Sequence, residues 1–256
     1  MQWKKIAIIA LDIAIAAYLV LAVTAFNKPD EKATVCSEVV IDIEQSDIDG
    51  FLNADDIKDM LVRHRLYPYA KSMKEVNTRA IEELLRRSPF VEQVECYKTQ
   101  SGHVCIELKQ RMPVARIMAD NGENYYMDTH GNILPGTQYP NNVIVVTGSV
   151  SRNFSKSKLF PVVSCIMKDR FWQNQAVQLN ILPDETIELI PRVGEHVAYL
   201  GNTDDIERKL ERLRKFYKYG LNAAGWNKYS YVSVEFSNQI VCKKKPTGRL
   251  AQKVKE

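Results

Sequence analysis

Histidine is scarce in this sequence: the 256 residues include only His64, His103, His130 and His196. Their spacing fits no metal-ligand pattern, and the five cysteines include no CxxC pair. The sequence also lacks a GxSxG nucleophile motif, a P-loop and a GxGxxG loop. We therefore expect no catalytic, cofactor-binding or metal-binding residues, and a protein that is not an enzyme.

The cysteine count is odd, and only Cys96 and Cys105 are placed to suggest a bridge across a hairpin. Val94 and Cys96 share one face of a predicted strand, and Val104 and Ile106 share one face of the next. Matching those faces pairs Cys96 with Val104 and turns Cys105 to the outer face. The alternation therefore argues against a disulfide.

Positive charge is concentrated at the C-terminus. The formal net charge is +4, yet segment 243–256 alone carries six basic residues against Glu256. The body of the chain is close to neutral, so it lacks the basic surface that nucleic acid binding requires. We expect no nucleic acid partner, and we expect 244–256 to be a disordered basic tail.

The N-terminus holds one long apolar run. Residues 6–26 carry a single charge, Asp12, and as a helix they would extend about 31 Å, close to the hydrocarbon thickness of a bilayer. Lys4 and Lys5 precede the run and favour a cytoplasmic N-terminus. A cleaved signal peptide is the alternative, because Val23-Thr24-Ala25 resembles a cleavage site. Signal peptides usually contain an apolar run of only about 7–15 residues, which favours an uncleaved anchor.

Residues 36–110 predict a strand, two helices and two more strands. Val39, Ile41 and Ile43 alternate with Val40, Asp42 and Glu44, which suggests a strand. Asn53 and Asn77 each stand where a helix N-cap is expected, and Ser88-Pro89 ends the second helix. Two strands follow over 91–98 and 103–110. The helices are too short to be stable alone and must pack on the sheet.

Residues 111–243 predict strands around two longer helices. One helix is expected over about 156–170, and another begins at a Thr203 cap. Strands are expected near 143–147, 177–182, 186–191, 196–200, 231–236 and 239–242. The sequence therefore favours an α+β protein whose second part is a mixed β-sheet with packed helices.

Three short motifs carry a family resemblance. The order of elements in 36–110, with Ser88-Pro89-Phe90-Val91-Glu92-Gln93-Val94, resembles a POTRA domain (βααββ). Lys109-Gln110-Arg111-Met112-Pro113-Val114-Ala115 is similar to the segment that leaves this domain in the bacterial cell-division proteins FtsQ and DivIB. Tyr126-Met127-Asp128-Thr129-His130-Gly131 matches that family's Tyr-x-Asp-x-x-Gly hairpin. The combination in this order resembles the FtsQ/DivIB family over most of the chain.

The resemblance implies a domain order. It comprises a cytoplasmic N-terminus, a transmembrane helix, a linker, the POTRA domain with Phe90 and Val94 in its core, a β domain and the tail. These cover residues 1–5, 6–26, 27–35, 36–110, 111–243 and 244–256. In this family Asp128 is a turn residue, and we prefer that role to an acid–base pair between Asp128 and His130.

The resemblance also implies a function. We expect a divisome scaffold in the bacterial inner membrane, enriched at the septum, with its folded domains in the periplasm. The expected partners are small bitopic coiled-coil proteins of the FtsB and FtsL type. A POTRA-containing component of an outer-membrane insertion or secretion machine is one alternative, and an anchored hydrolase is another. The first would need many more strands after Pro113, and the second lacks a nucleophile.

The last predicted strand is the expected partner-binding site. It has no successor except the basic tail, so it should lie at a sheet edge and accept a partner strand. Val241 is expected to offer an outward N–H. The FtsQ resemblance points to the same stretch, where Asn238-Gln239 replaces the glycine that the family often has in this turn. The expected contact residues are Phe236, Asn238, Gln239, Ile240, Val241 and Cys242.

Overall fold

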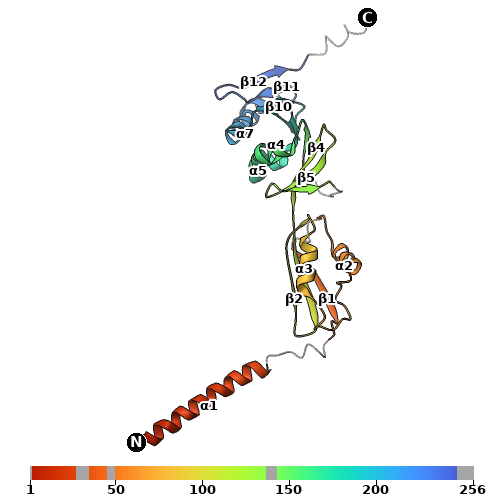
Figure 1. Cartoon of the computed structure of the whole chain (residues 1–256). Helices are drawn as coiled ribbons and strands as arrows, with labels where there is room; N and C mark the ends of the chain where they lie inside the picture. The colour runs from red at the N-terminus through yellow and green to blue at the C-terminus, as the bar shows by residue number, and fades with distance from the viewer. Residues whose placement is uncertain (1, 27–34, 45–49, 137–142, 247–256) are drawn as a thin grey trace. The chain divides into compact units, whose positions relative to one another are not determined.

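The computed structural model describes residues 2–26, 35–44, 50–136 and 143–246, and the chain divides into two compact units (Figure 1). The first comprises Met1–Ser46 and Leu52–Gln110, and the second comprises Asp47–Phe51 and Arg111–Glu256. The expected linker lies almost wholly outside the described residues, as does most of the expected tail.

The N-terminal helix α1 spans Gln2–Phe26 and is 25 residues long. Within the portion of the chain that the structure describes, no helix combines the length and the apolar character that crossing a bilayer requires. The expectation that residues 6–26 form a membrane-spanning helix is therefore not confirmed and stays a prediction.

The rest of the first unit has the predicted strand–helix–helix–strand–strand order. The sheet runs β1-β3-β2, with β1 parallel and β2 antiparallel to the central β3. The elements are β1 (Glu38–Glu44), α2 (Ala54–Arg63), α3 (Thr78–Arg86), β2 (Val91–Lys98) and β3 (His103–Gln110).

Both helices begin at the predicted asparagine caps. The Asn53 side chain accepts from the Asp56 N–H at 2.9 Å, and the Asp56 carboxylate accepts from the Asn53 N–H at 3.0 Å. This reciprocal pair satisfies two N–H groups that the first turn of a helix leaves unpaired. The Asn77 side chain accepts from the Ala80 N–H at 3.0 Å and caps α3 in the same way.

The helices cover one face of the sheet and bury its apolar side chains. Leu61 and Leu85 from the helices and Ile106 from β3 are fully buried in this core. Val94 is buried as expected, but Phe90 is only half-buried and lies outside the core cluster. The prediction for Phe90 was wrong because it precedes β2, where the sheet no longer sets which way a side chain points.

The two cysteines of the hairpin lie on opposite faces. Cys96 is buried and pairs with Ile106, whereas Cys105 pairs with Tyr97 on the open face. The expected outward position of Cys105 is confirmed. Cys96 pairs with Ile106 and not with Val104, so that part of the prediction was wrong. Both cysteines are free thiols.

The second unit is built on one nine-stranded mixed sheet, ordered β12-β11-β10-β9-β8-β7-β4-β5-β6. Its strands are β4 (Pro113–Ala119), β5 (Asn124–Asp128), β6 (Ile133–Pro135), β7 (Ile144–Gly148), β8 (Ala176–Ile181), β9 (Ile187–Pro191), β10 (Val197–Gly201), β11 (Tyr229–Ser233) and β12 (Val241–Lys244). Its helical segments are α4 (Arg152–Phe154), η1 (Ser155–Leu159), α5 (Phe160–Lys168), α6 (Arg170–Gln175), α7 (Ile206–Lys215), η2 (Phe216–Leu221) and α8 (Asn222–Ala224). The predicted α+β class and large mixed sheet are confirmed.

The helices of this unit differ in detail from the prediction. The segment near 156–170 is a π-helical turn followed by α5, and α6 begins at the Asp169 cap. α7 starts after Asp205, which has a φ of 50°, instead of at a Thr203 cap. Lys209 explains the later start, because its ammonium group bonds the carbonyl and side chain of Asn202 and holds the preceding loop out of the helix.

The core of the second unit lies between the sheet and these helices. Val146 and Leu179 of the central strands and Val163 of α5 are fully buried in one apolar cluster, and Val232 of β11 and Leu213 of α7 belong to the same cluster. The core is continuous from β5 to β11, so the outer strands are held by the same packing as the centre.

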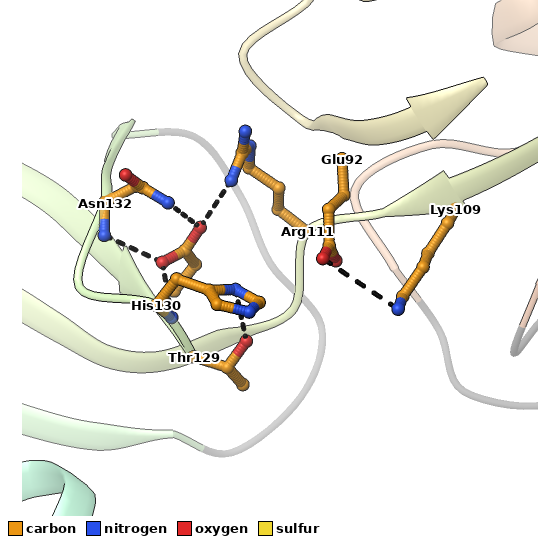
Figure 2. A network of polar contacts seen from close by, with 7 residues as sticks. Glu92, Lys109, Arg111, Thr129, His130 and Asn132 are labelled. Atoms are coloured by element: carbon orange, nitrogen blue, oxygen red, sulfur yellow. Dashed lines mark hydrogen bonds and ion pairs between the residues drawn. The ribbon is translucent and has the colours of Figure 1, made fainter.

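Asp128 organises the hairpin between β5 and β6. Figure 2 labels three of the residues that bond its carboxylate, namely Arg111, His130 and Asn132. The fully buried carboxylate accepts from the N–H groups of His130 and Asn132 at 2.8 and 2.7 Å, from the Asn132 amide at 2.9 Å and from Arg111 at 3.0 Å. Burial raises the pKa of Asp128, but these hydrogen bonds outweigh burial, and the net pKa is lowered.

The His130 ring contacts the Thr129 hydroxyl at 3.2 Å, and Asp128 holds His130 through the backbone N–H. The expected role of Asp128 as a turn residue therefore accounts for its contacts.

We predict different costs for truncating two apolar residues of the first unit. Leu85→Ala should lower the free energy of unfolding by about 2–5 kcal/mol, because it empties a fully buried site. Phe90→Ala should cost less than about 2 kcal/mol, because its side chain is only partly buried and lies outside the core cluster. Urea unfolding of both variants measures the difference. An equal or larger loss for Phe90→Ala would place it in the core after all.

We predict that Asp128→Asn destabilises the protein by about 2–3 kcal/mol at pH 7, because the variant removes the charge that Arg111 and the turn N–H groups stabilise. The folded pKa of Asp128 is lowered, so this stability is present above the unfolded pKa of about 3.9 and is lost as pH falls through the folded pKa. Denaturant unfolding should show the two proteins converging in strongly acidic buffer. A gap that does not change with pH would show that the ionised carboxylate contributes nothing.

Candidate partner-binding edge

β12 is the outermost strand of the nine-stranded sheet. It pairs antiparallel with β11 on one side, and no described strand lies on its other side. The register joins Val241 to Ser233, Cys242 to Val232 and Lys243 to Tyr231. The predicted edge position of the last strand is confirmed.

The hydrogen bonds around β11 fix which groups of β12 face outward. The Lys245 N–H donates to the Lys228 carbonyl at 3.1 Å, so the odd-numbered residues of β12 face β11. The Val234 N–H donates to the Tyr199 carbonyl at 3.0 Å, so the even-numbered residues of β11 face β10 and Ser233 faces β12. Both observations leave the N–H and C=O groups of Cys242 and Lys244 directed away from the sheet.

This alternation corrects the expectation for Val241. Its N–H faces Ser233 of β11 and belongs to the ladder, so it is not the edge donor that the sequence suggested. The expected strand over 239–242 starts two residues later, at Val241. Neither Asn238 nor Gln239 adopts a positive φ, because the longer connection makes the tight glycine turn unnecessary.

The six predicted contact residues therefore divide into two groups. Val241 and Cys242 lie in β12, and the structure brings them to the edge. Phe236, Asn238, Gln239 and Ile240 lie in the connection from β11. Phe236 is 51% exposed and Val241 47% exposed, whereas Ile240 and Cys242 are half-buried against the core. Burial raises the pKa of the Cys242 thiol, which keeps it protonated at neutral pH.

Two lysines belong to the edge strand itself. Lys243 and Lys244 are exposed, and neither forms an ion pair with any residue in the described ranges. Lys245 binds the Glu195 carboxylate, and this contact lowers the pKa of Glu195. The sequence reasoning treated the lysine run as a flank of the strand. A lysine side chain has a long apolar stem that suits an exposed strand position, and this property could have placed Lys243 and Lys244 within the predicted strand.

A pair of tyrosines lies on the outer face beside the edge. Tyr231, opposite Lys243, stacks on Tyr199 with ring centroids 5.9 Å apart. Burial, with Tyr199, Glu188 and Glu235 nearby, raises the pKa of Tyr231 to about 12. The pair offers an aromatic surface next to the free main-chain groups, and the sequence reasoning did not select it.

The helices behind β11 hold this edge in place. The Arg212 guanidinium donates to the Val234 carbonyl just beyond β11. Further along, the buried His196 ring contacts the Tyr217 hydroxyl at 2.8 Å, and burial lowers the pKa of His196. A neutral histidine at this position keeps the packing of η2 on the sheet free of buried charge.

The described residues contain no group of three or more histidine, cysteine or acidic side chains that could hold a metal ion. The chemistry that this edge offers is main-chain hydrogen bonding, with lysine and aromatic side chains beside it.

Two family models match the chain. Residues 34–109 match a POTRA-like domain, and residues 112–243 match the model described as FtsQ/DivIB, C-terminal related. No curated protein matches the chain. The second match covers more than half of the 256 residues and contains the whole sheet up to β12. The chain therefore belongs to the FtsQ/DivIB family.

Proposed function

We propose that this protein is a cell-division scaffold that links division proteins at the septum through protein–protein contacts and carries out no catalysis. Family membership supports the role in cell division. The free edge of β12 is the observation that carries the scaffold role, because it offers unpaired main-chain donors and acceptors on a strand held by a continuous core.

The proposed mechanism is strand addition. A partner segment pairs with the outward N–H and C=O groups of Cys242 and Lys244, and these hydrogen bonds supply affinity. Val241, Phe236 and the two lysines supply specificity through side chains beside the edge. Lysines also oppose pairing with a second copy of β12, because the two rows of like charge would meet.

The charge of this edge favours a partner segment with acidic residues. Within the family the expected partners are small bitopic coiled-coil proteins of the FtsB and FtsL type. Such a partner would order an extended segment on β12 while its helix stays in the membrane. The exposed Phe236 provides an apolar contact at the end of the same edge.

The proposed location is the bacterial inner membrane, with residues 6–26 in the bilayer and the two folded units in the periplasm. The apolar run and the preceding Lys4 and Lys5 support this orientation. An anchored scaffold would confine the β12 edge to the compartment where a bitopic partner exposes its own segment.

We predict that Lys244→Pro abolishes partner capture without unfolding the protein. The Lys244 N–H points outward, so proline removes an edge donor and leaves the ladder to β11 intact. Lys244→Gln is the matched control, because it removes the same charge and keeps the N–H. Pull-down of the FtsB-type protein from the same genome measures capture, and circular dichroism measures folding.

Capture should fall at least tenfold for Lys244→Pro and no more than about fivefold for Lys244→Gln, since a single exposed charge contributes about 0.2–1 kcal/mol. Equal capture by both variants, with folding retained, would exclude strand addition at β12. An equal loss for both would show that charge alone governs capture.

We predict that the mature protein keeps its first 26 residues, because the apolar run is longer than that of a signal peptide. Intact-mass measurement of the protein extracted from membranes checks this. A mass that corresponds to a start at Phe26 would identify residues 1–25 as a cleaved signal peptide. The proposed membrane anchor would then be wrong.

A further inference from the structure

The three-stranded sheet of the first unit has two edges that differ. At the β2 edge, the Cys96 N–H donates to the Glu82 carboxylate of α3 at 2.9 Å, so a helix side chain occupies an outward donor. At the β1 edge, the Cys36 N–H donates to the Lys71 carbonyl, and the Ala70 N–H donates to the Cys36 carbonyl. Cys36 precedes the strand, so these bonds do not involve β1 itself. No described strand pairs with the seven-residue strand β1 on the side away from β3.

The outward groups of β1 follow from the register. Because the Cys96 N–H turns toward Glu82, its antiparallel partner Ile106 also turns away from β2 and faces β1. Ile106 lies beside Ile41, and in a parallel ladder it bonds the residues on either side of that partner, Val40 and Asp42. Val39, Ile41 and Ile43 therefore direct their N–H and C=O groups outward.

Three of the four side chains that β1 presents on its open face are acidic, namely Glu38, Asp42 and Glu44, and the fourth is the exposed Val40. Asp42, Glu107 and Glu95 lie directly opposite one another across the three strands, and Glu44 follows Asp42 by two residues. They border a hollow of about 310 Å³ on this face. Like charges in direct register destabilise a sheet. Lys109 lies opposite Glu44 in the neighbouring row and pairs with Glu92 at 3.8 Å.

On the outer face of the second unit, polar side chains of neighbouring strands form hydrogen bonds with one another. There Gln178 donates to Thr147, Thr147 donates to Asn180, and Asn180 donates to Glu188 across neighbouring strands. In the first unit, the Glu107 carboxylate accepts from the Tyr97 hydroxyl at 2.6 Å, but Asp42, Glu44 and Glu95 have no side-chain hydrogen bond or ion pair among the described residues. On the opposite face of β1, Val39 and Ile41 remain half-buried and lack full apolar cover.

We propose that the β1 edge binds an extended segment of another protein in which basic residues alternate with apolar ones. Main-chain bonds form to Val39, Ile41 and Ile43, the basic side chains lie beside Asp42 and Glu44, and the apolar side chains cover Val39 and Ile41 on the helix face. A second copy of β1 is a poor partner, because its own carboxylates would meet these. The surface is separate from β12 and takes the opposite charge.

Two probe peptides of seven residues, matching β1 in length, test the proposal on the full chain in lipid nanodiscs. In one, lysine alternates with valine; in the other, glutamate alternates with valine. Amide hydrogen exchange is measured residue by residue. The lysine peptide should slow exchange at Val39, Ile41 and Ile43 at least tenfold, and the glutamate peptide should not. The glutamate peptide should instead protect Cys242 and Lys244, so failure at one edge is distinguishable from failure at the other.

Backbone methylation of the lysine peptide separates strand addition from attraction by charge. Whichever way the peptide runs, only one alternate set of its N–H groups faces β1. N-methylation of that set should weaken binding at least tenfold, and N-methylation of the other set should change it less than threefold. Retained binding by both methylated peptides would overturn the proposal.

A charge variant tests the role of the carboxylates. The double variant Asp42→Asn, Glu44→Gln should bind the lysine peptide at least fivefold more weakly at low ionic strength. Asp59→Asn with Glu75→Gln is the matched control, because it removes two exposed charges outside the sheet. The proposal would be overturned if both double variants weakened binding of the lysine peptide equally. It would also be overturned by exchange protection centred away from β1, or by self-association of the chain through β1.

Discussion

The structure depends on the pairing of main-chain groups across its two sheets. Every strand carries N–H and C=O groups on both sides, and burying one of them unpaired costs on the order of 1–3 kcal/mol. Interior strands such as β8 and β3 satisfy both sides. The terminal strands satisfy one, so the position of a strand in the sheet decides where the protein can bind another chain.

The edge strands differ in which residues bond or flank their outward main-chain groups. Glu82 of α3 occupies an outward N–H of β2. The segment between α2 and α3 bonds Cys36, which precedes β1. β12 is left open and carries lysines, while the open face beside β1 carries carboxylates. Charged edges oppose pairing with copies of themselves and favour partners of opposite charge. The two edges therefore carry opposite charge, which is the basis on which we propose that they bind different partners.

The hairpin at Asp128 shows how local chemistry supports this arrangement. Its carboxylate joins the turn between β5 and β6 to Arg111, the residue after the first unit ends. The hydrogen bonds keep a buried carboxylate ionised, which suits a structural role more than proton transfer. The turn lies at the opposite end of the strand order from β12, so the two sites are separated by the whole sheet.

The sequence by itself determined the local elements of the first unit. The strands over 91–98 and 103–110, the caps at Asn53 and Asn77 and the helix end before Pro89 follow from alternation and capping, which involve residues near in the chain. It also indicated that the last predicted strand lies at a sheet edge, because the basic segment 243–256 carries no further strand pattern.

Only the tertiary structure decided which groups each edge offers. The ladder to β11 turns the N–H of Val241 inward and those of Cys242 and Lys244 outward, and Lys209 sets the start of α7 through Asn202. The register between β1, β3 and β2 likewise places Asp42, Glu107 and Glu95 in one row. These outcomes depend on pairing between distant segments, and a shift of one residue would reverse every face.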